Sequence, residues 1–259
     1  EVYDLPLKKE NQYLPDLKQI PKEIAKKAKL LYINYPNNPT GAFATEAFFK
    51  EVVDFANQNQ ILVVQDAAYA ALTFDGTKPL SILSIEGAKE VCVEIHSLSK
   101  AFNMTGWRMA FVAGNAIAVK AFAAVKDNND SGQFAAIQLA GKYALEHTEI
   151  THHINEKYSR RHDMLTKTLK ELGFDAKKPK ASFYLYLDVP KGIKGGRRFE
   201  NAEEFSHYLI YEKCISTVPW DDVEHCVRMS VTFLAETEEE EKKVMAEIKK
   251  RLSDVEFEF

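Results

Sequence analysis

The sequence predicts an α/β fold: a mostly parallel central sheet flanked by helices, followed by a smaller C-terminal α+β domain. Apolar runs of strand length occupy residues 30–33, 61–64 and 91–95. Their starts are about thirty residues apart, which is the length of a strand–helix–strand unit. The chain has 259 residues, 46% of them hydrophobic, and can therefore bury one large core or two modest ones.

The segment between the first two runs predicts a helix over residues 45–57. Thr45 suits its N-cap, and apolar residues follow at roughly helical spacing: Phe48, Phe49, Val52, Val53 and Phe55. The connection over residues 66–90 is less regular. A fourth apolar run, at residues 109–113, follows the third too closely for a crossover helix between them, so we expect it to run antiparallel.

The second half of the chain begins with apolar residues at helical spacing, which predict helices over residues 116–125, 134–145 and 154–172. Past Gly173 the pattern changes and predicts a strand at 182–189, a helix at 202–213 and a strand at 227–233. Thr237 and Glu240 form a capping-box pattern before a last helix that runs to residue 252. We place a domain boundary near residue 150, which gives two domains, residues 1–150 and 151–259.

Composition excludes several classes of function. The chain has 34 Lys and Arg against 38 Asp and Glu, and no basic stripe that would suit a nucleic acid. No apolar run approaches the roughly twenty residues that span a bilayer, so no membrane partner is expected. Cys92, Cys214 and Cys226 lack paired spacing, which favours a cytoplasmic location over a disulfide framework. The histidines show no metal-ligand spacing, so we expect no metal.

The start of the chain, EVYDLPLKKENQ, has no initiator Met and resembles the middle of a domain. We therefore expect the sequence to be a piece of a longer polypeptide.

Polar residues follow each of the first three apolar runs. They are Asn38 within NNPTG, then Asp66 and Tyr69, then Ser97, Ser99 and Lys100, with Arg108 eight residues further on. Ligands of open α/β sheets bind beyond the carboxyl ends of the strands, so we expect these side chains at one edge of the sheet. Taken singly, each has an ordinary explanation: NPTG as a turn, a carboxylate as a helix cap, a lysine as a surface charge.

Taken together, these motifs resemble those of the fold-type I pyridoxal-phosphate aminotransferases, class I/II, of the aspartate aminotransferase superfamily. NNPTG, the pair Asp66-x-x-Tyr69, and Ser97-x-Ser99-Lys100 occur in the family's order, and the resemblance covers essentially the whole chain. The stretch SLSKAFNMTGWRMAFVAGN looks like the branch that holds LL-diaminopimelate and aspartate-type aminotransferases.

The resemblance implies that pyridoxal 5'-phosphate is the cofactor and that Lys100 is the catalytic amine. Lys100 would form an imine with the cofactor aldehyde and then carry a proton at the substrate α-carbon. Both tasks require a neutral amine, so we expect partial burial and cationic neighbours to lower its pKa. Arg108, Ser97 and Ser99 would hold the cofactor phosphate.

The remaining roles follow from the same resemblance. Asp66 would face the pyridine nitrogen, where a carboxylate favours the protonated ring. Asn38 and Tyr69 would hydrogen-bond the phenolic oxygen of the ring. Arg228, in VRMS, would bind the substrate α-carboxylate, and a bidentate grip there orients the α-hydrogen. Tyr184 and Trp220 are further candidates for the substrate pocket, although aromatic residues more often belong to a core.

The reaction that these roles imply is transamination between an amino acid and a 2-oxo acid such as 2-oxoglutarate, in a homodimer. Aspartate, glutamate and LL-diaminopimelate are the candidate amino donors. The motifs serve imine chemistry in general, so a pyridoxal-phosphate lyase stays open, as does a non-catalytic fragment. Family members also carry a Gly-rich phosphate-binding turn and an aromatic residue that stacks on the ring, and neither occurs in this sequence.

Overall fold

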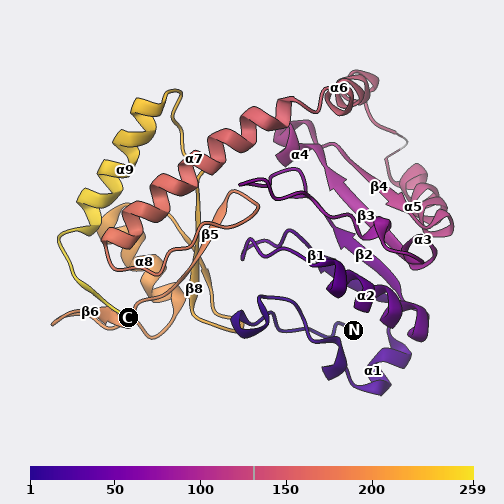
Figure 1. The fold of residues 1–259 in the computed structure, drawn as a ribbon, viewed down its shortest axis with the longest axis horizontal. Helices are drawn as coiled ribbons and strands as arrows, with labels where there is room; N and C mark the ends of the chain where they lie inside the picture. The colour runs from indigo at the N-terminus through magenta and orange to yellow at the C-terminus, as the bar shows by residue number, and fades with distance from the viewer. Residues whose placement is uncertain (131) are drawn as a thin grey trace. The chain divides into compact units, whose positions relative to one another are not determined.

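Residues 1–130 and 132–259 are described by a computed structural model (Figure 1). The chain divides into two units. Unit 1 comprises Glu1–Asn37 and Ala42–Asn155, and unit 2 comprises Asn38–Gly41 and Glu156–Phe259. The short NPTG segment therefore belongs to unit 2, although the residues on each side of it in the sequence belong to unit 1.

The sheet of unit 1 has four strands in the order β1-β2-β3-β4. Their bounds are β1 Leu30–Asn34, β2 Leu62–Asp66, β3 Cys92–Ser97 and β4 Ala110–Gly114. The first three strands are parallel, and β4 is antiparallel to β3. The predicted α/β class with a mostly parallel sheet is therefore confirmed, and so is the antiparallel direction of the fourth strand.

The helices of unit 1 agree in part with the sequence pattern. They are α1 Lys22–Lys27, α2 Glu46–Asn59, α3 Ala88–Val91, α4 Leu98–Ala101, α5 Ala116–Asn129 and α6 Ala135–Glu146, with 3-10 turns at Lys9–Asn11, Leu17–Gln19, Ile82–Ser84 and Thr105–Trp107. The N-cap at Thr45 is confirmed, since its side chain accepts a hydrogen bond from the amide of Phe48 at 3.1 Å. The pattern did not predict α1, α3 or α4, which are too short to show a helical period.

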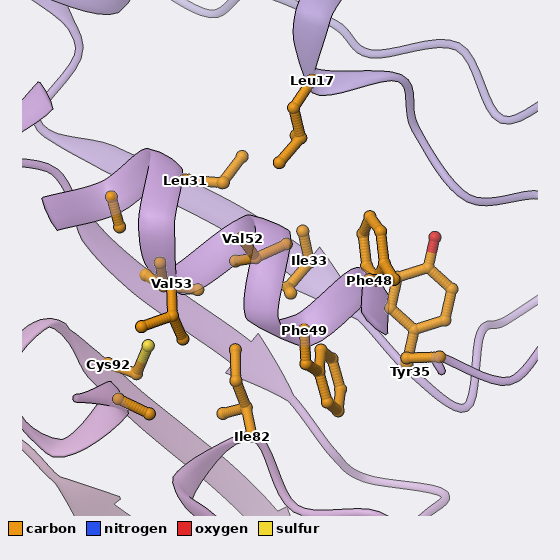
Figure 2. Close-up of a cluster of buried hydrophobic side chains, with 14 of the residues drawn as sticks. Leu17, Leu31, Ile33, Tyr35, Phe48, Phe49, Val52, Val53, Ile82 and Cys92 are labelled. Carbon is orange, nitrogen blue, oxygen red and sulfur yellow. The ribbon is translucent and has the colours of Figure 1, made fainter. Parts of the chain in front are cut away.

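A hydrophobic core lies between α2 and one face of the sheet (Figure 2). Leu31 and Ile33 of β1 and Val63 of β2 are at most 9% exposed, and they belong to the same cluster as Phe49 and Val52 of α2. Side chains alternate along a strand, so the residues between them point to the other face. On that face Leu30 and Tyr32 are 63% and 60% exposed.

Unit 2 is built on an antiparallel sheet in the order β5-β8-β7. The strands are β5 Tyr184–Asp188, β8 Cys226–Ser230 and β7 Val218–Trp220, and a separate pair joins β6 Gly192–Ile193 to β9 Phe257–Glu258. Its helices are α8 Ala202–Lys213, α9 Glu238–Leu252 and the larger part of α7 Ile150–Glu171, which begins four residues before the predicted start. The capping box of Thr237 and Glu240 is confirmed.

A buried ion pair joins α7, α9 and the segment that follows β8. Arg161 is 1% exposed, and its Nε donates to Glu241 at 2.7 Å. The same guanidinium donates to the carbonyl oxygens of Val231 and Phe233 at 3.0 and 2.8 Å. A buried charge is tolerated when its donors are satisfied in this way. The guanidinium of Arg161 thus links α7 to α9 and to the segment after β8.

Within the part of the chain that the structure describes, we find no helix that combines the length and the apolar character needed to cross a membrane.

We expect Gly41→Ala to lower the free energy of unfolding by about 3 kcal/mol, measured by urea denaturation. Gly41 has φ +70°, and an added Cβ would lie 2.6 Å from Cβ of Pro179. Gly76 is the matched control, because it has φ +74° and no described heavy atom within 4 Å of an added Cβ. Gly76→Ala should therefore lower the free energy of unfolding by only about 1 kcal/mol, which is the cost of the left-handed backbone conformation alone. Equal losses for the two variants would contradict the close approach to Pro179.

Candidate active site

The carboxyl ends of β1, β2 and β3 bring the predicted residues of unit 1 to one edge of the sheet. Asn34 is the register partner of Asp66, and Asp66 is the partner of Ile95. Ser97, two residues beyond Ile95, ends β3 at the same edge. Parallel strands in this register present their final side chains together, which is where open α/β sheets bind ligands.

Two donors hold the carboxylate of Asp66. The amide of Ala68 donates to Oδ1 at 3.1 Å, and the hydroxyl of Tyr32 donates to Oδ2 at 2.8 Å. The side-chain amide of Asn34 donates to the backbone oxygen of Asp66 at 2.8 Å, which closes the end of β2 against β1. Tyr69 follows in the next turn and is 6% exposed.

Lys100 lies on α4, directly after β3. Ser97 is the N-cap of this helix, and its Oγ accepts a hydrogen bond from the amide of Ser99 at 3.2 Å. Ser99 is 8% exposed, and Lys100 is half-buried. Burial, and then the positive charge of Arg108, lower the pKa of Lys100. This is the direction that a nucleophilic amine requires.

Arg108 is brought close to Lys100 by a short loop. The hydroxyl of Thr105 donates to the backbone oxygen of Ser99 at 3.1 Å, and Nη1 of Arg108 donates to the backbone oxygen of Thr105 at 2.9 Å. Arg108 has φ +54°, a left-handed conformation that turns the chain back toward α4. Unit 1 therefore gathers two cations and the hydroxyls of Ser97 and Ser99 around α4, which is a donor set suited to a phosphate.

Arg228 and Asn38 form the corresponding group in unit 2. Nη1 of Arg228, on β8, donates to Oδ1 of Asn38 at 2.8 Å. The guanidinium lies 3.9 Å from the ring centroid of Tyr184 and 5.8 Å from that of Trp220. Tyr184 and Trp220 were candidates for the pocket, and the structure places them beside this guanidinium. Stacking fixes the plane of an arginine and leaves its edge for a carboxylate.

Tyr32 is a site residue that the sequence pattern missed. In the run 30–33 it counts as one more apolar residue of a strand, and nothing local marks its hydroxyl as a partner of a residue 34 positions away. A signal was present: Tyr32 and Asn34 share one face of the strand with Leu30, opposite the face that packs on α2.

The described part of the chain contains one group with metal-ligand geometry, Asp188, Glu224 and Cys226, whose ligand atoms all lie within 4.8 Å of one another. Burial raises the pKa of the Cys226 thiol to about 12. A cysteine binds metals as the thiolate, so this group is poorly suited to a metal.

Comparison with known proteins identifies the class of this fold and site. The model of the aminotransferase class I and II family matches residues 1–248. The chain belongs to the class I and II aminotransferase family, whose members depend on pyridoxal phosphate. The resemblance that the motifs suggested is therefore confirmed.

Among its relatives, the chain is 57% identical over 267 residues to the LL-diaminopimelate aminotransferase of Methanocaldococcus jannaschii and 58% identical over 263 residues to that of Methanococcus maripaludis. Each alignment covers 100% of this chain and 63% of the relative. The chain thus spans less than two thirds of the length of these relatives.

Solved structures give the same fold. Substrate-bound BacF from Bacillus subtilis has a TM-score of 0.89 and 37% identity, with 100% of this chain and 64% of that chain covered. The probable N-succinyldiaminopimelate aminotransferase from Thermus thermophilus has a TM-score of 0.82 and 29% identity, with 96% and 65% covered.

The residues of unit 1 fit the cofactor of this family. Lys100 is an amine with a lowered pKa, as reaction with an aldehyde requires, and Arg108 beside it is a cation suited to a phosphate. The carboxylate of Asp66, held by two donors, suits a protonated ring nitrogen.

We expect Arg108→Gln to raise the pKa of Lys100 in the cofactor-free protein, because the substitution removes a positive neighbour while the burial of the amine remains. The measurement is the pH dependence of amine acylation at Lys100, followed by mass spectrometry. Arg197→Gln removes a charge that is not among the causes of this shift and should leave that pKa where it is. A Lys100 pKa that does not change in Arg108→Gln would contradict the electrostatic contact.

Proposed function

We propose that the protein is a pyridoxal-phosphate-dependent amino acid aminotransferase that takes LL-diaminopimelate as amino donor and 2-oxoglutarate as acceptor. The environment of Lys100 carries the proposal: a half-buried amine whose pKa is lowered by burial and by Arg108. The choice of donor is supported by the relatives of 57% and 58% identity, which are named LL-diaminopimelate aminotransferases.

In this proposal the side chains of unit 1 bind the cofactor and move one proton. Arg108, Ser97 and Ser99 bind the phosphate through charge-assisted hydrogen bonds. Lys100 would act through its neutral amine, as the base that removes the proton from the substrate α-carbon. Pyridoxal phosphate, when bound, accepts the electron pair that this carbon releases. Asp66 keeps a proton on the ring nitrogen, and Tyr69 donates to the ring oxygen.

Arg228 binds the α-carboxylate of the substrate in the proposal. Its guanidinium is held by the ring of Tyr184 at 3.9 Å and by Oδ1 of Asn38 at 2.8 Å. These contacts fix the direction in which the remaining N–H groups point. A guanidinium held in one orientation binds the substrate carboxylate in one orientation. The α-hydrogen of the substrate then points in one direction, as proton removal requires.

The organisation of the chain is part of the proposal. We propose that residues 1–150 belong to the large cofactor-binding domain of the family and residues 151–259 to its small domain. We also propose a homodimer, because unit 1 exposes large apolar side chains on α5 and α6, among them Ile117 at 80%, Val125 at 70% and Leu139 at 67%. The free cysteines support a cytoplasmic location.

A panel of amino donors tests the function. The full-length protein is given 2-oxoglutarate with LL-diaminopimelate, aspartate or glutamate, and we expect glutamate to form fastest with LL-diaminopimelate. Lys100→Ala should lower turnover by about a thousandfold, because it removes the proton carrier, and should abolish the visible absorbance band of the bound cofactor. Lys50→Ala, an exposed lysine on α2, is the control and should keep both. Ammonia and a 2-oxo acid formed without an acceptor would identify a lyase instead.

We expect Arg228→Lys to raise KM for the amino donor by about tenfold or more, with a smaller change in kcat. Lysine keeps the positive charge but loses the bidentate fork and the stacking on Tyr184. Steady-state kinetics gives the two constants separately. Arg198→Lys is the matched control, because Arg198 forms an exposed ion pair with Glu258 elsewhere in unit 2. An unchanged KM in Arg228→Lys would remove Arg228 from the substrate site.

A further inference from the structure

Tyr32 reaches Asp66 diagonally across the sheet. In the parallel pairing of β1 with β2, Tyr32 lies opposite Val64 and Asn34 lies opposite Asp66. Tyr32 is therefore two residues short of Asp66, on the same face, and its long side chain covers that interval. Its hydroxyl donates to Oδ2 of Asp66 at 2.8 Å, a normal separation for a hydrogen bond between two oxygens.

The second donor on this carboxylate comes from another segment. The amide of Ala68, in the turn after β2, donates to Oδ1 at 3.1 Å. The terminal torsion of an aspartate has a broad minimum, so a single hydrogen bond leaves the carboxylate able to rotate. Donors from two segments, one on each oxygen, restrict it to one orientation. An ionised carboxylate accepts about four hydrogen bonds, so capacity remains for a donor on a ligand.

Tyr32 is suited to this task because it keeps its proton. Burial of the hydroxyl, the hydrogen bond to Asp66 and the negative charge of Asp66, in that order, raise the pKa of Tyr32 to about 12. The phenol therefore donates throughout the pH range in which an enzyme works. The ring gains little from packing, since 60% of the residue is exposed, so the hydroxyl is the part of this side chain that has a specific partner.

We propose that Tyr32 is a positioning residue for Asp66: it holds the carboxylate in the orientation in which its oxygens can accept a hydrogen bond from the protonated ring nitrogen of the cofactor. The inference rests on the proposed function and adds to it a residue outside the motifs NNPTG, Asp66-x-x-Tyr69 and Ser97-x-Ser99-Lys100. Without the hydroxyl, the ring nitrogen is expected to hold its proton less firmly.

The test compares Tyr32→Phe with the wild type as full-length holoenzyme. The first measurement is the 15N chemical shift of the ring nitrogen in bound 15N-labelled pyridoxal phosphate, which reports protonation at that atom. We expect the shift of Tyr32→Phe to move toward the unprotonated form. We also expect kcat to fall by about tenfold, with KM within about twofold of the wild type. Tyr211→Phe removes a hydroxyl from a residue that is 78% exposed on α8 and should change neither quantity.

A second measurement needs no cofactor. In the cofactor-free protein labelled with 13Cζ-tyrosine, Asp66→Asn should lower the pKa of Tyr32, because two of the three causes that raise it are removed. A pKa of Tyr32 that Asp66→Asn leaves unchanged would overturn the contact itself. If Tyr32→Phe kept the 15N shift of the ring nitrogen and the kcat of the wild type, the positioning role of Tyr32 would be overturned. Failure of the wild-type protein to bind pyridoxal phosphate would overturn the proposed function, and the role of Tyr32 with it.

Discussion

The register of β1, β2 and β3 is the constraint on which the rest of unit 1 depends. Val63 packs with the residues of α2, and the alternation along β2 then turns Asp66 to the opposite face. A slip by one residue would bury the carboxylate against α2 and expose Val63, so the hydrophobic core fixes the orientation of the polar edge. The hydrogen bonds of Tyr32 and Asn34 to Asp66 follow from this register, because it places Asn34 opposite Asp66 and Tyr32 two residues earlier on the same face.

The positions of Lys100 and Arg108 beside α4 are electrostatically unfavourable on their own. Lys100 and Arg108 repel each other, and the half-buried position of Lys100 adds a desolvation penalty. In the proposed function a bound dianion would neutralise Arg108 while the amine of Lys100 stays uncharged. In the proposed function a phosphate-bearing ligand would relieve this repulsion, and a ligand that binds only the folded state stabilises it by mass action. The lowered pKa of Lys100 and the proposed phosphate site would then both result from the position of Arg108 beside the amine.

Sequence patterns predicted those elements whose signal is local. The helix capped by Thr45 and the antiparallel β4 were predicted because apolar spacing and chain length suffice for them. The pattern did not reveal the four-residue helix α4, which shows no period, or β7, whose three residues include Pro219. It also missed the partners of the site residues. Tyr32 meets Asp66, and Asn38 meets Arg228, across separations of 34 and 190 residues that only the folded chain closes.

Asn38 shows how sequence order and structural grouping differ. Its motif follows β1, yet residues 38–41 belong to unit 2, where Gly41 approaches Pro179 and Asn38 accepts a hydrogen bond from Arg228. Asn38 therefore groups with Arg228 and not with Asp66. In the proposed function Arg228 binds the substrate carboxylate. The hydrogen bond from Arg228 to Asn38 sets the orientation of the amide and that of the guanidinium together, so a change at Asn38 would reach the carboxylate-binding group.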